Sequence, residues 1–120
     1  MTRTNLILAA AIGALAAAPA PAATPPSPPV FWAGCAGALA VKSQRSDQAA
    51  APGIAGQARR ALAQAKLAAN PDKLTPAQID GVAIAAGRSF KTELAANPAR
   101  EPAFEKAVQV CTAALAKLPG

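Results

Sequence analysis

Apolar residues recur at every third or fourth position in four stretches of the chain, a spacing that places them on one face of an α-helix. The four stretches are residues 30–45, 54–69, 75–97 and 101–118. The last stretch shows the pattern most clearly, and its apolar face consists of Phe104, Ala107, Val108, Cys111, Leu115 and Leu118. The pattern therefore predicts an all-α chain of four helices joined by short connections.

Turn and capping residues mark where these helices begin and end. Thr75 can cap the third helix, Pro76 suits its first position, and Gln78 completes a capping box. The second and third helices should stop at the Asn-Pro pairs 70–71 and 97–98, because a residue before proline avoids the helical conformation. Short connections of this kind favour an antiparallel arrangement of neighbouring helices.

The first stretch contains two glycines, Gly34 and Gly37. Each weakens a helix by about 1 kcal/mol relative to alanine. We therefore expect these glycines to permit the close approach of a neighbouring helix; the alternative is a local break in the helix. Residues 43–53 are predicted to connect the first two helices, because Pro52 and Gly53 are helix breakers.

The start of the chain has the features of a secretory signal peptide, residues 1–22. Arg3 precedes an apolar run of 13 residues, 6–18, and small residues follow at 20–22. A membrane-spanning helix needs about 20 apolar residues, so this run is too short to be an anchor. We expect cleavage after Ala22, localisation in the periplasm or outside the cell, and no transmembrane span in the mature chain.

A proline-rich segment, residues 23–29, is predicted to form an extended tail before a helical domain at 30–120.

The whole chain has a net charge of +6. Loss of residues 1–22 removes one of 12 basic and none of 6 acidic residues, which leaves a net charge of +5. This charge favours an envelope protein or an anionic polymer as partner. Nucleic acid is not expected, because export separates it from the chain and no aromatic residues are interleaved with the charges.

Two cysteines in an exported chain indicate one disulfide, Cys35–Cys111. In an up-down-up-down bundle the first and last helices are antiparallel neighbours, and both cysteines then lie near the same end. We therefore predict a small, alanine-rich, antiparallel four-helix bundle closed by this bond. The alternative is a lipoprotein cleavage site at residues 32–35, but it lies far beyond the apolar run and would leave Cys111 without a partner.

Groups that carry out catalysis are scarce in this chain. It has no histidine and no tyrosine, and its serines occur in no nucleophile motif. Glu101 and Glu105 share a helix face, yet such a pair usually complements the positive end of the helix dipole. The ligand sets of zinc sites and of calcium loops are missing as well, so we expect no metal and no cofactor. The protein is predicted not to be an enzyme.

Two groups of residues are candidates for binding a partner. Arg59, Arg60 and Lys66 form a basic face that could contact an anionic surface. Phe31 and Trp32 could anchor a partner at one end of the bundle. The structural alternatives are a solvated helix face for the cations and closure of the core for the aromatic rings.

These observations favour a non-catalytic, exported binding or interaction protein of unknown ligand. The alternative is a stress-related periplasmic holdase that exposes its alanine-rich faces, which an assay of client aggregation would identify. A weaker alternative is a hydrolase that uses Glu101 or Glu105. Replacement of these two residues by glutamine would leave any activity unchanged if that alternative is wrong.

Overall fold

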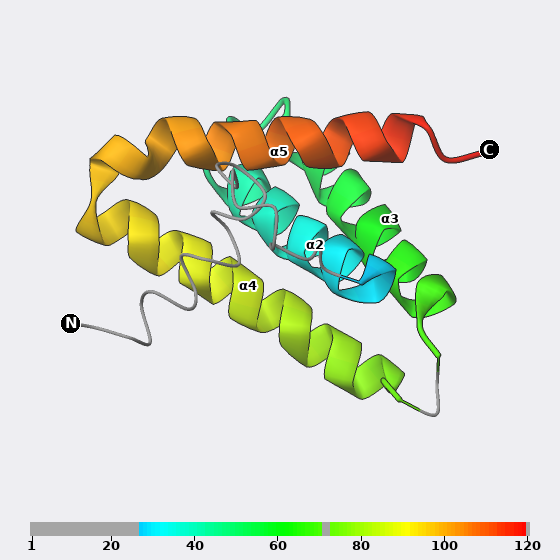
Figure 1. The fold of residues 1–120 in the computed structure, drawn as a ribbon. Coiled ribbons are helices and arrows are strands. Elements are labelled where there is room, and N and C mark those ends of the chain that lie inside the picture. Colours follow the sequence, from blue (N-terminus) through cyan, green and yellow to red (C-terminus); the bar gives the residue numbers. More distant parts are fainter. Residues whose placement is uncertain (1–26, 71–72, 120) are drawn as a thin grey trace, which may run out of the picture.

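The structure, a computed structural model, describes residues 27–70 and 73–119 (Figure 1). This part of the chain is all-α, and the four predicted helices are confirmed. They are α2 (Pro28–Gln44), α3 (Ala51–Ala68), α4 (Pro76–Ala96) and α5 (Glu101–Ala116), with a short 3-10 helix, η1 (Pro98–Arg100), between the last two. The predicted signal peptide and the first residues of the predicted tail lie outside the described residues.

Two helices begin earlier than the sequence analysis predicted. α2 begins at Pro28 instead of Val30, and α3 begins at Ala51 instead of Ile54. In both cases proline lies in the first helical turn, where its missing N–H is not needed for a hydrogen bond within the helix. Pro52 therefore helps to start α3 and does not break it. The predicted extended tail is correspondingly shorter at its end.

The predicted capping box at the start of α4 is confirmed. The backbone N–H of Gln78 donates to Oγ1 of Thr75 over 3.2 Å, and the backbone N–H of Thr75 donates to Oε1 of Gln78 over 2.8 Å. α4 ends just before Asn97, as predicted, and the Asn97 side chain accepts a hydrogen bond from the N–H of Ala99. This turn leads through η1 directly into α5.

α2 is the central helix of the fold. Figure 1 shows α3 running back along one side of α2, α4 running along its other side, and α5 crossing over these helices. α2 is consequently buried almost all round, and its buried residues are Trp32, Ala33, Cys35, Ala36, Gly37, Ala38, Leu39 and Val41. This arrangement differs from the simple up-down-up-down bundle of the sequence analysis, in which the first and third helices are not direct neighbours.

The close packing of α2 against α4 has a local cause at Gly37. A Cβ atom at this position would lie 2.7 Å from both the carbonyl oxygen of Ala83 and the backbone nitrogen of Gly87, and 2.8 Å from Cβ of Ala86. Only glycine permits backbones to approach so closely. The prediction of a close helix approach is confirmed for Gly37, but it is wrong for Gly34, where a Cβ would meet no atom within 4 Å.

The predicted apolar face of α5 packs onto this core. Phe104, Val108, Cys111 and Leu115 are buried. The ring of Phe104 meets that of Phe90 on α4 edge to face, with 5.4 Å between the ring centroids. Aromatic pairs prefer this geometry because the positive edge of one ring faces the negative face of the other.

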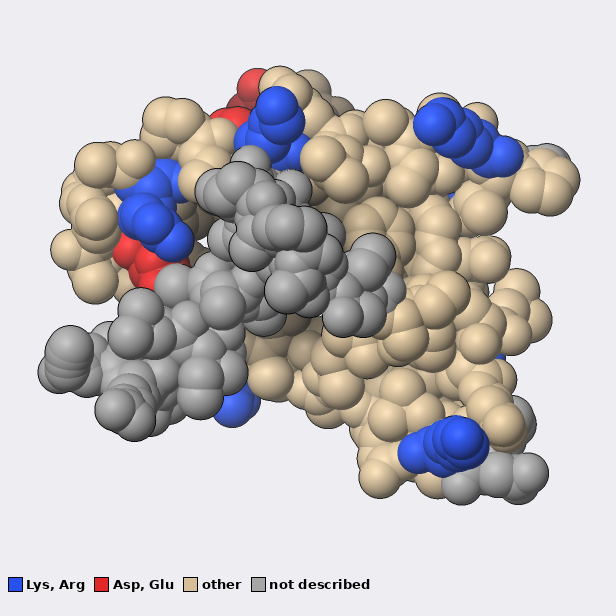
Figure 2. All heavy atoms as spheres, in the orientation of Figure 1, with Lys and Arg blue, Asp and Glu red and all other residues tan. Residues whose placement is uncertain are grey.

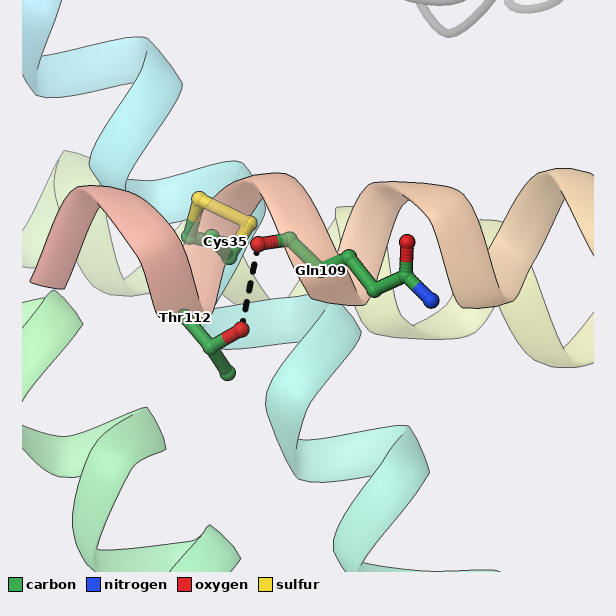
Figure 3. The surroundings of a disulfide bond; sticks show 4 residues. Cys35, Gln109 and Thr112 are labelled. Atoms are coloured by element: carbon green, nitrogen blue, oxygen red, sulfur yellow. Dashed lines mark hydrogen bonds between the residues drawn. A yellow bond between two sulfur atoms is a disulfide. The ribbon is translucent and has the colours of Figure 1, made fainter. Parts of the chain in front are cut away.

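The predicted disulfide joins α5 to α2 (Figure 3). The Cα atoms of Cys35 and Cys111 are 5.5 Å apart, and both cysteines are buried. One turn of α5 beside the bond carries a further hydrogen bond, from Oγ1 of Thr112 to the carbonyl oxygen of Gln109 over 3.1 Å. The bond therefore connects the middle of the central helix to the helix that crosses it.

Candidate functional site

The candidate site is a groove of about 410 Å³ on the side of α2 that faces away from α5. α5 contacts α2 through Cys35 and Lys42, whereas the groove is lined by α2 residues such as Ala40 and Gln44. In a helix of 3.6 residues per turn, Ala40 and Gln44 point about 140° and 180° away from Cys35. The floor of the groove thus lies on a face of α2 that α5 does not reach.

Three helices supply the residues that line the groove. α3 and α4 both pack against α2 but make few contacts with each other, so a trough remains between them over α2. The floor consists of Ala36, Gly37, Ala40, Val41 and Gln44 of α2. The walls consist of Ala58, Arg59 and Leu62 of α3, and of Ala83, Ile84, Gly87, Arg88 and Lys91 of α4.

The groove is apolar at its floor and open to solvent. Small residues dominate the floor, and the half-buried side chain of Leu62 lies on the α3 wall. On the α4 wall, Ile84 is 57% exposed although it is a large apolar residue.

Three cations, Arg59, Arg88 and Lys91, stand along the two walls, and we call them the cationic rim. Among the described residues, no acidic side chain lines the groove. Among residues 27–70 and 73–119, the acidic side chains that form ion pairs do so elsewhere: the pairs are Lys42–Glu105, Arg45–Glu101, Lys66–Asp80 and Arg100–Glu93. The cationic rim therefore has no counter-charge in the described part of the chain.

The structure divides the basic face predicted on α3. Lys66 forms an ion pair with Asp80 of α4, with 2.9 Å between Nζ and Oδ1. Arg60 is exposed but does not line the groove, whereas its neighbour Arg59 does. On the face drawn in Figure 2, Lys and Arg side chains lie in separate groups around a surface of uncharged residues. A contact of Arg59, Arg60 and Lys66 with an anionic surface stays a prediction.

The aromatic pair predicted as an anchor lies at the start of α2. Trp32 is 9% exposed and belongs to the core, while Phe31 is half-buried and packs edge to face on Trp32, with 5.2 Å between the ring centroids. Little of the Trp32 ring is accessible to a partner in this structure. Closure of the core accounts for its position, and its role as an anchor stays a prediction.

The two glutamates considered for catalysis each contact a different cation on α2. Glu105 accepts a hydrogen bond from Nζ of Lys42 over 2.8 Å, and Glu101 pairs with Arg45. The guanidinium of Arg45 also lies over the Phe104 ring, 5.9 Å from its centroid. These contacts attach the start of α5 to the end of α2, which is a structural use of both carboxylates.

Arg88 and Lys91 were not identified from the sequence. A signal was present, because Ile84, Arg88 and Lys91 follow one another at spacings of four and three and so share one helix face. This face is distinct from the core face of α4, where Phe90 and Leu94 are buried. The missing information was that Arg59 of α3 stands on the opposite wall of the same groove.

In the part of the chain that the structure describes, no three His, Cys, Asp or Glu side chains gather where they could hold a metal ion. No helix within 27–70 or 73–119 has both the length and the apolar character needed to cross a membrane. Comparison of the chain with protein-family models, curated proteins and solved structures finds no match.

Proposed function

We propose that this chain is a non-catalytic binding protein that acts through the groove between α3 and α4. The observation that carries the proposal is the cationic rim, which has no counter-charge among the described residues and lies around an apolar floor. A partner with apolar surface and opposite charge would be complementary to both features. The ligand should therefore combine an apolar body with at least one anionic group.

The polar groups around the groove suit binding better than catalysis. They are two guanidinium groups, one ammonium group and the amide of Gln44. Arginine stays charged at all physiological pH values and recognises carboxylates or phosphates through its planar fork of donors. General acid–base chemistry would instead call for a group that titrates near neutral pH, and the chain has no histidine to supply one.

A groove-filling substitution tests this function. Ala40 is half-buried on the floor, so phenylalanine at this position should occupy the groove without entering the core. With anilinonaphthalene sulfonate, an apolar anion, as the probe, we expect Ala40→Phe to weaken binding roughly tenfold, or by about 1.4 kcal/mol. Fluorescence titration measures the affinity, and circular dichroism checks that the variant is folded.

The matched control is Ala113→Phe, which adds the same ring at an exposed position of α5 outside the groove. It should leave the affinity for the dye within about twofold of the original protein. Equal binding by folded Ala40→Phe and by the original protein would place the dye elsewhere. In that case the groove is not the binding site of the dye.

We further propose that the protein is exported and works in the periplasm or outside the cell. The proposal is supported by the signal-like pattern of residues 1–22 and by a disulfide, since disulfides persist in oxidising compartments. The intact mass of protein from an envelope fraction should correspond to a chain that begins at Ala23. It should gain two alkyl groups only after reduction.

Two results of the mass measurement would contradict export with the disulfide intact. One is a full-length chain whose thiols react without reduction. The other is a chain that begins at a lipid-modified Cys35, because lipidation of that sulfur is incompatible with its bond to Cys111. The two results differ in mass, so the same spectrum distinguishes them.

A further inference from the structure

We propose that the occupant of the groove is an amphipathic α-helix of a partner protein, with acidic side chains on both flanks of its apolar stripe. The inference rests on the proposed function and names its partner class. It depends on three features of the groove: its position around α2, its length, and the placement of the cationic rim.

The position of the groove is that of a missing helix. α2 has α3 and α4 on its two sides and α5 across a third, and the groove lies over the face that is left. The floor there includes Ala40, which is half-buried and whose small side chain permits a close approach. Helices pack with their axes about 8–10 Å apart, the shorter values where small residues meet. A helix in the groove would therefore complete the packing around α2.

The length of the groove suits two turns of helix. The floor runs from Ala36 to Gln44 and the α4 wall from Ala83 to Lys91, a separation of eight positions in each case. At 1.5 Å per residue this is about 12 Å. A helix bound in a groove uses anchors at positions i, i+3 or i+4, and i+7, which span about 10.5 Å.

The charges lie where a helix would carry its flanking residues. Arg59 stands on the α3 wall, and Arg88 and Lys91 stand on the α4 wall, so cations face the groove from both sides. Glutamate or aspartate beside the apolar stripe of the partner could reach these side chains. Charge-assisted hydrogen bonds between arginine and carboxylate are among the stronger polar contacts in proteins.

A second copy of this chain fits the groove less well. A symmetric dimer would place the groove of one copy against that of the other and bring two cationic rims together. The chain also has a net charge of +6, so association of copies brings like charges together.

A lipid fits less well for a different reason. Small-molecule sites usually bury about 70–90% of their ligand. This groove is open along its length, with Ile84 57% exposed on one wall and the cationic rim exposed on both. A helix needs only one buried face, so an open groove suits a helix better than an acyl chain.

The test uses a synthetic peptide of about 16 residues, long enough to form a helix, with leucines at helical spacing flanked by glutamates. Fluorescence anisotropy of the labelled peptide measures binding to the full chain with its disulfide intact. We expect Arg59→Glu and Arg88→Glu each to weaken binding about five- to tenfold. The peptide with lysine in place of each glutamate should not bind.

Arg60→Glu is the matched control for Arg59→Glu, because it changes net charge equally at the next residue but outside the groove. It should change the affinity by no more than about twofold. Equal losses of peptide affinity in Arg59→Glu and Arg60→Glu would show that net charge alone attracts the peptide, and would contradict the inference.

Phosphatidylglycerol vesicles serve as a second probe. If vesicles bind in a way that depends on Arg59 and the acidic peptide does not bind, the partner is a lipid surface and the inference of a helical partner is wrong.

The failure of this inference can be told from the failure of the proposed function. Suppose that the acidic peptide does not bind, that the dye does, and that Ala40→Phe weakens dye binding. The groove is then a binding site, and only the inference of a helical partner is wrong. If Ala40→Phe also leaves dye binding unchanged, both the proposed function and the inference are wrong.

Discussion

Replacing both Cys35 and Cys111 with alanine is expected to lower the melting temperature by roughly 15–30 °C. The bond joins residues 76 positions apart, and closing a loop of that length stabilises a folded chain by roughly 4 kcal/mol, mainly through the entropy of the unfolded state. In a domain of this size, each kcal/mol corresponds to roughly 4–8 °C. Typical domains are stable by only about 5–15 kcal/mol, so the loss is a large fraction of the total.

The other contacts of α5 with α2 are too weak to compensate for this loss. The ion pairs Lys42–Glu105 and Arg45–Glu101 are partly exposed. Ion pairs of this kind contribute about 0–1 kcal/mol each, because water screens them and ordering the side chains costs entropy. The remaining attachment is apolar and comes from one face of α5, including Phe104 and Leu115.

Circular dichroism melting curves of the oxidised protein, the reduced protein and the double variant provide the measurement. The double variant avoids the free thiol that a single substitution would leave, and reduction of the original protein breaks the bond without changing any residue. All α-helical signal should be lost at a lower temperature in both cases. A decrease of only a degree or two in either would show that the bond contributes little to stability.

Gly37→Ala should destabilise the protein even though alanine is the better helix former. The new Cβ would meet Ala83 and Gly87 backbone atoms at 2.7 Å, and backbone cannot move aside as the end of a flexible side chain can. α2 and α4 must then separate. Overpacking of this kind costs about 1–3 kcal/mol, which lowers the melting temperature by roughly 5–20 °C.

Gly34→Ala is the matched control, because it is the same substitution three residues earlier in the same helix. A Cβ at Gly34 meets nothing within 4 Å, so only the gain in helix propensity remains, up to about 1 kcal/mol. Thermal or denaturant unfolding should thus move in opposite directions for the two variants. Two stabilised variants would show that α2 and α4 do not approach as closely as the structure indicates.

Features that depend on neighbouring residues along the chain could be predicted from the sequence. The four helices follow from the spacing of apolar residues, and the capping box of Thr75 and Gln78 follows from residues three positions apart. The pairing of Cys35 with Cys111 follows from the presence of only two cysteines in the chain, whatever the arrangement of the helices. The early starts of α2 and α3 were missed because proline breaks a helix in its interior but suits its first turn.

Features that depend on which helices become neighbours were decided by the tertiary structure. The sequence showed Gly34 and Gly37 as equivalent small residues, but only Gly37 meets α4. The charges differ in the same way: Lys66 and Arg59 share one helix, yet of these two only Lys66 has an acidic partner among the described residues, Asp80 on α4. Helical periodicity defines the faces of each helix and leaves their pairing open. The groove exists because α3 and α4 both pack on α2 but make few contacts with each other, an arrangement set by contacts between distant residues.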